Sequence, residues 1–127
     1  MDVHSINTRL FAYYRSIGIS IYDIHDINKG YCFNWAMLAY RTYGGKLCTV
    51  TNYSGHAFIK LKGKYYDSET PKGVKNWRLL KAYKGDQKKD VLKAKVKDMK
   101  ITNEVYFIKH WEQEGKYTFV DIMKLNY

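Results

Sequence analysis

The hydrophobic pattern of the first third of the chain predicts two amphipathic helices. Residues 2–17 carry apolar side chains at intervals of three and four, and a glycine follows as a stop signal. Residues 31–43 repeat this period with Cys32 on the apolar stripe, and the Gly44-Gly45 pair that follows favours a left-handed helix end. We therefore expect the second helix to begin at or just before Cys32.

The period changes to two after these glycines, which indicates strands. Residues 46–52 alternate in the manner of a β-strand. Residues 56–61 and 64–67 flank Lys62-Gly63, which is typical of a two-residue hairpin turn. With this turn, we expect residues whose numbers sum to 125 to face each other across the hairpin.

The rest of the chain gives weaker patterns. We expect one or two helical turns within residues 74–83 and strands over residues 91–97, 104–111 and 116–123. Helices followed by mostly antiparallel strands indicate an α+β fold, with the N-terminal helices packed on the sheet. The length suits a single domain over residues 1–127.

Composition excludes several classes of protein. Apolar residues make up 46% of the chain, which is too many for a disordered protein. No run approaches the roughly 20 apolar residues that span a bilayer, and no leader is visible, so we expect a cytoplasmic protein without membrane insertion. The net charge of +10 would attract an anionic partner such as nucleic acid or an acidic protein. The lysines within residues 88–100 are interpreted most simply as a solvated face.

Cys32 has the setting of a nucleophile. A thiol at a helix N-terminus is favoured as the thiolate, which is the reactive form. Ala36 and Ala39 lie behind it and are small enough to let a sheet approach, so a histidine on that sheet could reach the sulfur. Cys48 lies within an alternating strand, and we expect it to pack in the core.

His56 opens the first hairpin strand and shares a face with two carboxylates. A two-residue turn makes His56 face Glu69 and places Asp67 diagonally on the same face, about 7–8 Å away between backbones. A three-residue turn would send Asp67 to the opposite face. Cys32, His56 and Asp67 would then supply the nucleophile, the base and the orienting carboxylate of acyl-transfer chemistry, with Glu69 as the alternative third member.

The spacing of the histidines and cysteines does not indicate a metal site or a cofactor. The histidines, His4, His25, His56 and His110, are scattered, and no CxxC or HxxxH spacing occurs. The two cysteines are too few for a disulfide scaffold.

The segments around Cys32 and His56 carry recognisable motifs. Residues 30–36 read GYCFNWA, and residues 55–69 read GHAFIKLKGKYYDSE. They resemble the two core motifs of papain-like cysteine hydrolases, in particular the compact NlpC/P60 and transglutaminase-like branch. The resemblance extends over about a third of the chain and implies a papain-like fold. It also implies that Cys32 is the nucleophile, His56 the general base and acid, and Asp67 the third member.

Two features differ from the cell-wall branch of this family. That branch carries an aspartate before the nucleophile, whereas this chain has Tyr31 before Cys32, which weakens peptidoglycan as the substrate. Many relatives bind the oxyanion with a side chain upstream of the cysteine. Asn28, His25 and the backbone N–H of Cys32 are the alternatives for that role here.

Two hypotheses of function follow. The leading one is a cysteine hydrolase or acyltransferase, of the peptidase or amidase kind, that acts on an amide, peptide or isopeptide bond through a Cys32 thioester. The alternative is a catalytically inactive papain-like scaffold that serves as a basic binding module for an anionic partner. The small chain, rich in lysine and tyrosine, also resembles phage-encoded proteins, which would act in the host cell. The sequence indicates neither the substrate nor the oligomeric state.

Overall fold

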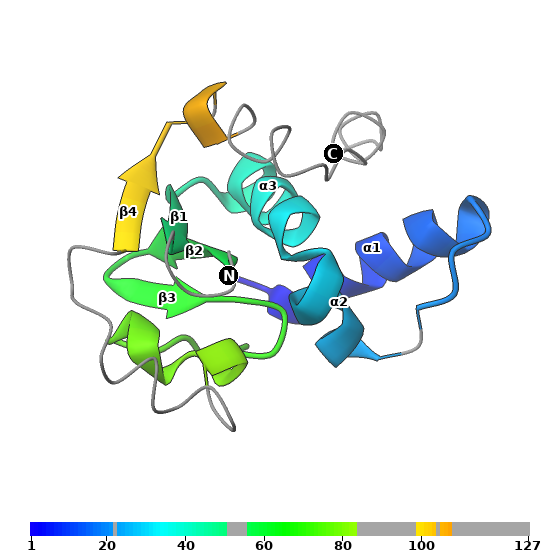
Figure 1. Cartoon of the computed structure of the whole chain (residues 1–127), viewed down its shortest axis with the longest axis horizontal. Helices are drawn as coiled ribbons and strands as arrows, with labels where there is room; N and C mark the ends of the chain where they lie inside the picture. The colour runs from blue at the N-terminus through cyan, green and yellow to red at the C-terminus, as the bar shows by residue number, and fades with distance from the viewer. Residues whose placement is uncertain (22, 51–55, 84–98, 104, 108–127) are drawn as a thin grey trace.

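The computed structural model of the chain has an α+β fold, as expected (Figure 1). It describes residues 1–21, 23–50, 56–83, 99–103 and 105–107. Helices from the N-terminal end of the chain pack on a four-stranded antiparallel sheet with strand order β3-β2-β1-β4. Among the described residues, no helix combines the length and the apolar character that crossing a membrane requires.

The helical layer is formed by α1 (Val3–Ser16), α2 (Ile24–Gly30) and α3 (Cys32–Tyr43). The helices predicted over residues 2–17 and 31–43 are therefore confirmed. Helix α3 ends at Gly44, whose φ of 80° and ψ of −146° lie in a region that glycine adopts without strain and other residues avoid. Helix α2 was not predicted, because seven residues are too few to show a helical period.

The sheet consists of β1 (Lys46–Val50), β2 (Ala57–Leu61), β3 (Lys64–Tyr66) and β4 (Met99–Thr102). Strands β2 and β3 form the predicted hairpin.

Its register pairs Lys60 with Tyr65, whose numbers sum to 125 as the two-residue turn requires. Lys62 and Gly63 have φ of 51° and 79°, and two positive φ angles are the signature of a tight type I′ turn. The turn on which the predicted site depends is therefore present.

The strand expected over residues 104–111 is wrong where the structure describes it. Residues 105–107 are helical, because the Asn103 side chain accepts a hydrogen bond from the Tyr106 N–H at 2.8 Å and so caps the turn. Phe107 is fully buried on the same turn.

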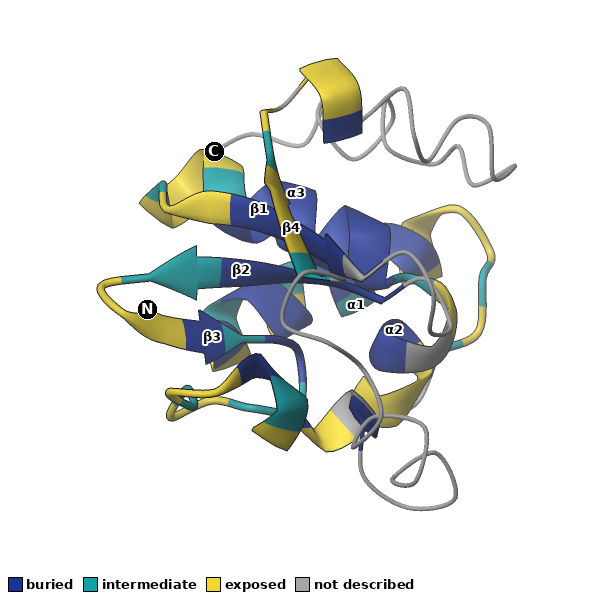
Figure 2. Cartoon of the chain, turned by 60° about the vertical axis from the view of Figure 1, so that its left-hand side comes forward, coloured by how far each residue is buried: buried dark blue, intermediate teal, exposed yellow. Residues whose placement is uncertain are grey.

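Strand β4 was not predicted. Its sequence, MKIT, alternates apolar and polar residues, but four residues are too few to establish a period, and both central residues are exposed (Figure 2). The strands expected over residues 91–97 and 116–123, and most of the lysine-rich segment, lie outside the described residues.

The sheet separates two apolar clusters. The first lies between the helices and one face of β1 and β2, where Ala36 and Ala39 of α3 are fully buried. The second lies on the opposite face and consists of Cys48, Phe58, Tyr65, Trp77, Leu80 and Tyr83. Two short 3-10 helices, η1 (Trp77–Leu79) and η2 (Lys81–Tyr83), cover this second cluster, which confirms the helical turns expected there.

Candidate active site

Cys32 lies at the start of α3, as predicted. Its side chain is largely buried, and the residue before it, Tyr31, makes no side-chain hydrogen bond to cap the helix. The positive end of the helix macrodipole at this position favours a negative charge on the sulfur. Both cysteines of the protein are free thiols.

His56 and Asp67 form the centre of the site. His56 immediately precedes β2, and Asp67 immediately follows β3, so the hairpin brings them together. His56 Nε2 lies 3.1 Å from Asp67 Oδ2, and the two side chains are 4% and 1% exposed. His56 is also hydrogen-bonded to Cys32. Because Nε2 is engaged with Asp67, this second bond falls to Nδ1, the other ring nitrogen.

The charges of the site support one another. Burial alone would lower the pKa of His56, but hydrogen bonds to Asp67 and Cys32 and their negative charges outweigh burial and raise the pKa to about 9. Burial would likewise raise the pKa of Asp67, but its hydrogen bond and attraction to His56 lower it. At neutral pH, the site therefore contains an imidazolium ion next to a carboxylate and beside the Cys32 sulfur.

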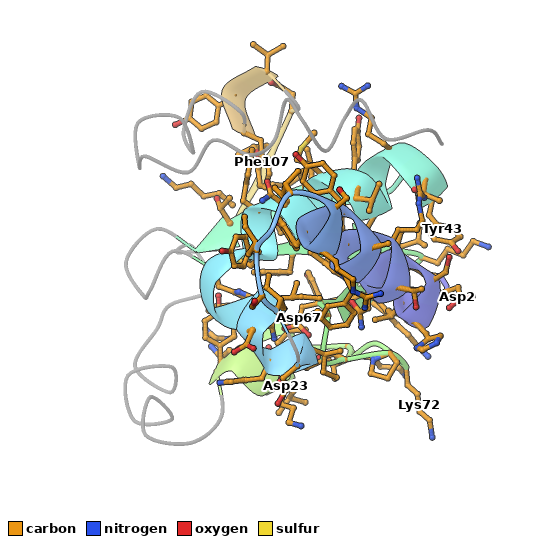
Figure 3. The ribbon with its side chains drawn as sticks, turned by 90° about the vertical axis from the view of Figure 1, so that its right-hand side faces the viewer. Asp2, Asp23, Tyr43, Asp67, Lys72 and Phe107 are labelled. Carbon is orange, nitrogen blue, oxygen red and sulfur yellow. The ribbon has the colours of Figure 1, made fainter. Side chains whose placement is uncertain are left out.

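The loop after β3 orients the Asp67 carboxylate. Oδ1 accepts hydrogen bonds from the Glu69 N–H at 3.0 Å and from the Thr70 hydroxyl at 2.7 Å, which leaves Oδ2 for His56. In Figure 3, Asp67 lies in the middle of the molecule, whereas Asp2 and Lys72 lie at its periphery. The short Asp-containing turn therefore fixes an otherwise rotatable carboxylate.

The N-terminal helices anchor this loop. The Asn7 side chain of α1 donates to the Ser68 carbonyl at 2.9 Å and accepts from Trp35 Nε1 at 2.8 Å. The Ser68 hydroxyl donates to the Ile24 carbonyl at 3.1 Å. Sequence reasoning missed these positioning residues, although one signal was present: Asn7 is a polar residue next to the apolar stripe of the first helix.

Comparison with protein-family models, with curated proteins and with solved structures finds no match.

Glu69, the alternative third member, points away from the imidazole. Its Oε2 accepts from Asn28 Nδ2 at 3.1 Å, and its Oε1 lies 3.1 Å from His25 Nδ1. Strand β3 ends at Tyr66, so the hairpin register that would place Glu69 opposite His56 does not extend that far. The structure thus brings Asp67, rather than Glu69, to His56.

The side chains considered for the oxyanion role are engaged elsewhere. The Asn28 amide group is hydrogen-bonded to Glu69 and to Asp67, so it is engaged with carboxylates. His25 is paired with Glu69, and its side chain is 61% exposed. This geometry favours a positioning role for Asn28 and leaves the Cys32 backbone N–H as the remaining candidate for the oxyanion role among the three alternatives.

The surroundings of the site are aromatic and contain the second thiol. The His56 ring stacks on Phe58 at 5.8 Å between centroids and meets the edge of Tyr83 at 5.5 Å. Cys48 is fully buried, and burial raises the pKa of its thiol to about 12, so it stays neutral and packs as predicted. Within the described part of the chain, no group of three His, Cys, Asp or Glu side chains is placed to hold a metal ion.

Proposed function

We propose that the protein is a cysteine hydrolase or acyltransferase that acts on an amide, peptide or isopeptide bond through a thioester at Cys32. The observation that carries this proposal is the buried His56 side chain, which is hydrogen-bonded both to Asp67 and to Cys32. A thiol, an imidazole and a carboxylate in this order are the groups that acyl transfer needs.

Each of the three side chains has a defined step. The Cys32 thiolate attacks the carbonyl carbon of the substrate, and a tetrahedral intermediate forms with its charge on the carbonyl oxygen. The His56 imidazolium gives its Nδ1 proton to the leaving amine, the carbon–nitrogen bond breaks, and the acyl group stays on Cys32 as a thioester. Asp67 keeps the proton on Nε2 and holds the plane of the ring throughout.

The second half of the cycle releases the acyl group. Neutral His56 takes a proton from water, or from an acceptor amine or alcohol, and this nucleophile attacks the thioester. The thiolate leaves, and the imidazolium form is restored. Whether the enzyme hydrolyses or transfers therefore depends on the nucleophile that reaches the thioester.

The architecture supports a papain-like core as part of this proposal. Helix α3 carries Cys32 at its first residue and packs against β2, which begins directly after His56. Asp67 follows on the neighbouring strand of the hairpin. This is the arrangement that the motifs around Cys32 and His56 imply.

The test is acylation of the protein by p-nitrophenyl acetate at neutral pH, in a Cys48→Ser background, followed by intact-mass measurement. We expect one acetyl group on Cys32 and none after Cys32→Ser. His56→Gln, which keeps most of the side-chain volume, should slow acylation by about 10²–10⁴-fold. His25→Gln is the matched control because His25 is exposed and pairs with Glu69, and it should acylate like the parent. An equal rate in His56→Gln and the parent would overturn the proposal.

One observation favours the binding-module alternative. Lys46 of β1 lies directly opposite Lys60 of β2, so the two lysines concentrate positive charge at this end of the sheet, which would attract an anionic partner. A basic binding module would bind RNA, DNA or an acidic protein in a manner that weakens with salt and survives Cys32→Ala.

A further inference from the structure

Tyr83 stands next to the site without having been part of the predicted triad. It ends η2 and is 1% exposed. Its ring meets the His56 ring edge-on, with centroids 5.5 Å apart at an interplanar angle of 84°, and meets Trp77 in the same way at 5.4 Å. The phenol is therefore held in one orientation against the catalytic imidazole.

The hydroxyl group of Tyr83 is buried and makes no hydrogen bond within the described part of the chain. Buried tyrosine hydroxyls normally find a partner, because desolvating an unpaired hydroxyl destabilises the folded state. A substrate bound at Cys32 would supply the acceptor that the described part of the chain does not supply.

The electrostatic surroundings keep this hydroxyl protonated. Burial raises the pKa of Tyr83, and the nearby negative charges of Cys32 and Asp67 raise it further. The hydroxyl is thus a neutral donor on a ring that contacts His56, and it stays neutral over the pH range in which the Cys32 thiolate is reactive. The Asn28 amide, by contrast, is hydrogen-bonded to Glu69 and Asp67, and His25 is paired with Glu69.

We propose that the Tyr83 hydroxyl donates a hydrogen bond to the carbonyl oxygen of the substrate and stabilises the oxyanion formed when Cys32 attacks. This inference rests on the proposed function and adds a fourth catalytic residue to it. During attack, negative charge moves from the sulfur to the carbonyl oxygen, and the Tyr83 O–H bond turns toward that oxygen without losing its proton. When the carbonyl double bond re-forms, the electron pair of the broken bond leaves with the leaving group, Cys32 keeps the acyl group as a neutral thioester, and the oxyanion that the hydroxyl stabilised is gone.

The experiment compares two reagents on Tyr83→Phe in the Cys48→Ser background. p-Nitrophenyl acetate passes through an oxyanion, whereas iodoacetamide loses iodide from a tetrahedral carbon and forms none. We expect acylation to slow by about 10²–10³-fold, as for loss of one oxyanion donor, while alkylation of Cys32 changes less than about twofold. Tyr65→Phe is the matched control, because Tyr65 belongs to the same aromatic cluster and packs on Phe58. It should leave both rates unchanged.

The outcomes separate this inference from the proposed function. Unchanged acylation in Tyr83→Phe, with the His56 dependence intact, overturns the role of Tyr83 alone. An equal loss of acylation and alkylation also overturns it, because Tyr83 would then act through the thiolate or His56. A parent protein whose acylation does not depend on His56 overturns the proposed function itself.

The melting temperature provides a second readout. Tyr83→Phe removes an unpaired buried group, so the melting temperature should stay level or rise. A fall below that of Tyr65→Phe would reveal a structural partner for the hydroxyl and overturn the proposal.

Discussion

The imidazole of His56 and the carboxylate of Asp67 meet inside the protein, 3.1 Å apart between Nε2 and Oδ2, although they lie eleven positions apart in the chain. The tight turn at Lys62 and Gly63 makes this possible, because its two positive φ angles bring β3 back beside β2. With Nε2 held by Asp67, Nδ1 is committed to Cys32. The reactivity of the sulfur should therefore depend on the histidine.

The first prediction concerns the pH profile of Cys32 alkylation. In the Cys48→Ser background, the rate with iodoacetamide should form a plateau that extends well below the pH at which a free thiol of pKa about 8.5 loses reactivity. His56→Gln should abolish the plateau and give an ordinary thiol curve. Rates measured between about pH 5 and pH 9 test this, and identical profiles in the two proteins would exclude an activated pair.

The second prediction distinguishes the two carboxylates. Asp67→Asn should slow acylation by about 10²–10⁴-fold. An amide has one oxygen, which cannot accept the hydrogen bonds of the loop and also pair with the charged imidazole. It should also destabilise the fold by about 3–5 kcal/mol, since it leaves a buried charge unpaired. Glu69→Gln should keep acylation within about threefold, because Glu69 binds Asn28 and His25. Single-turnover rates and urea unfolding provide the measurements, and a larger rate loss in Glu69→Gln would reverse the assignment.

The third prediction concerns stability and pH. The pKa of His56 rises from 6.5 to about 9 on folding, so the folded protein binds more protons between these values. The free energy of unfolding should be highest below pH 6.5 on this account and should decline as the pH rises through about 9. The pKa of Asp67 is lowered from 3.8, so its contribution is present above that pH and disappears as the pH falls further. Urea titrations of the parent and of His56→Gln should differ in the alkaline decline, which the variant should lack.

The fourth prediction concerns the loop that follows Asp67. Gly73 has a φ of 71°, and a Cβ there would lie 2.7 Å from the Tyr66 ring and 3.0 Å from Lys64 Cβ. Because half-buried Tyr66 packs against the first apolar cluster, moving its ring away from a new Cβ would lose part of that packing. Gly73→Ala should therefore destabilise the protein by about 1–3 kcal/mol beyond the backbone strain alone.

Gly18→Ala is the control for that strain. Gly18 has a similar φ of 81°, but a Cβ there would meet open space. Its substitution should cost only about 1–2 kcal/mol, and thermal unfolding of the two variants should show the difference. An equal loss of stability in the two variants would mean that the Tyr66 ring moves away from the new Cβ without destabilising the protein.

The parts of the site that could be predicted from sequence depend on local chemistry. The residue pair Lys62-Gly63 specifies one turn type, and the turn type specifies the register that brings Asp67 to the His56 face. The position of Cys32 at a helix start follows from the apolar period and from the glycine pair after the helix. These features depend only on residues that are close in the sequence, so the sequence pattern predicts them.

The parts that could not be predicted depend on contacts between distant residues. Helix α2 was missed because it is short, although Asn28 on it holds both acidic side chains of the loop. Glu69 was expected opposite His56, but β3 ends before the register reaches it. Tyr83 gave no signal, since a buried aromatic residue in a short helical turn looks like any core residue in the sequence.

The hydrogen bond from Asn7 to the Ser68 carbonyl joins residues 61 positions apart. This separation affects the order in which the parts of the site fold. The hairpin can close from local contacts, whereas docking of α1 onto the loop must first close a long segment of chain. A folding intermediate with a formed hairpin but an undocked α1 would hold Asp67 loosely. In that intermediate, Cys32 would react as an ordinary thiol. The rate of Cys32 labelling during refolding would then report when α1 docks onto the loop. The step that completes the fold would also be the step that activates Cys32.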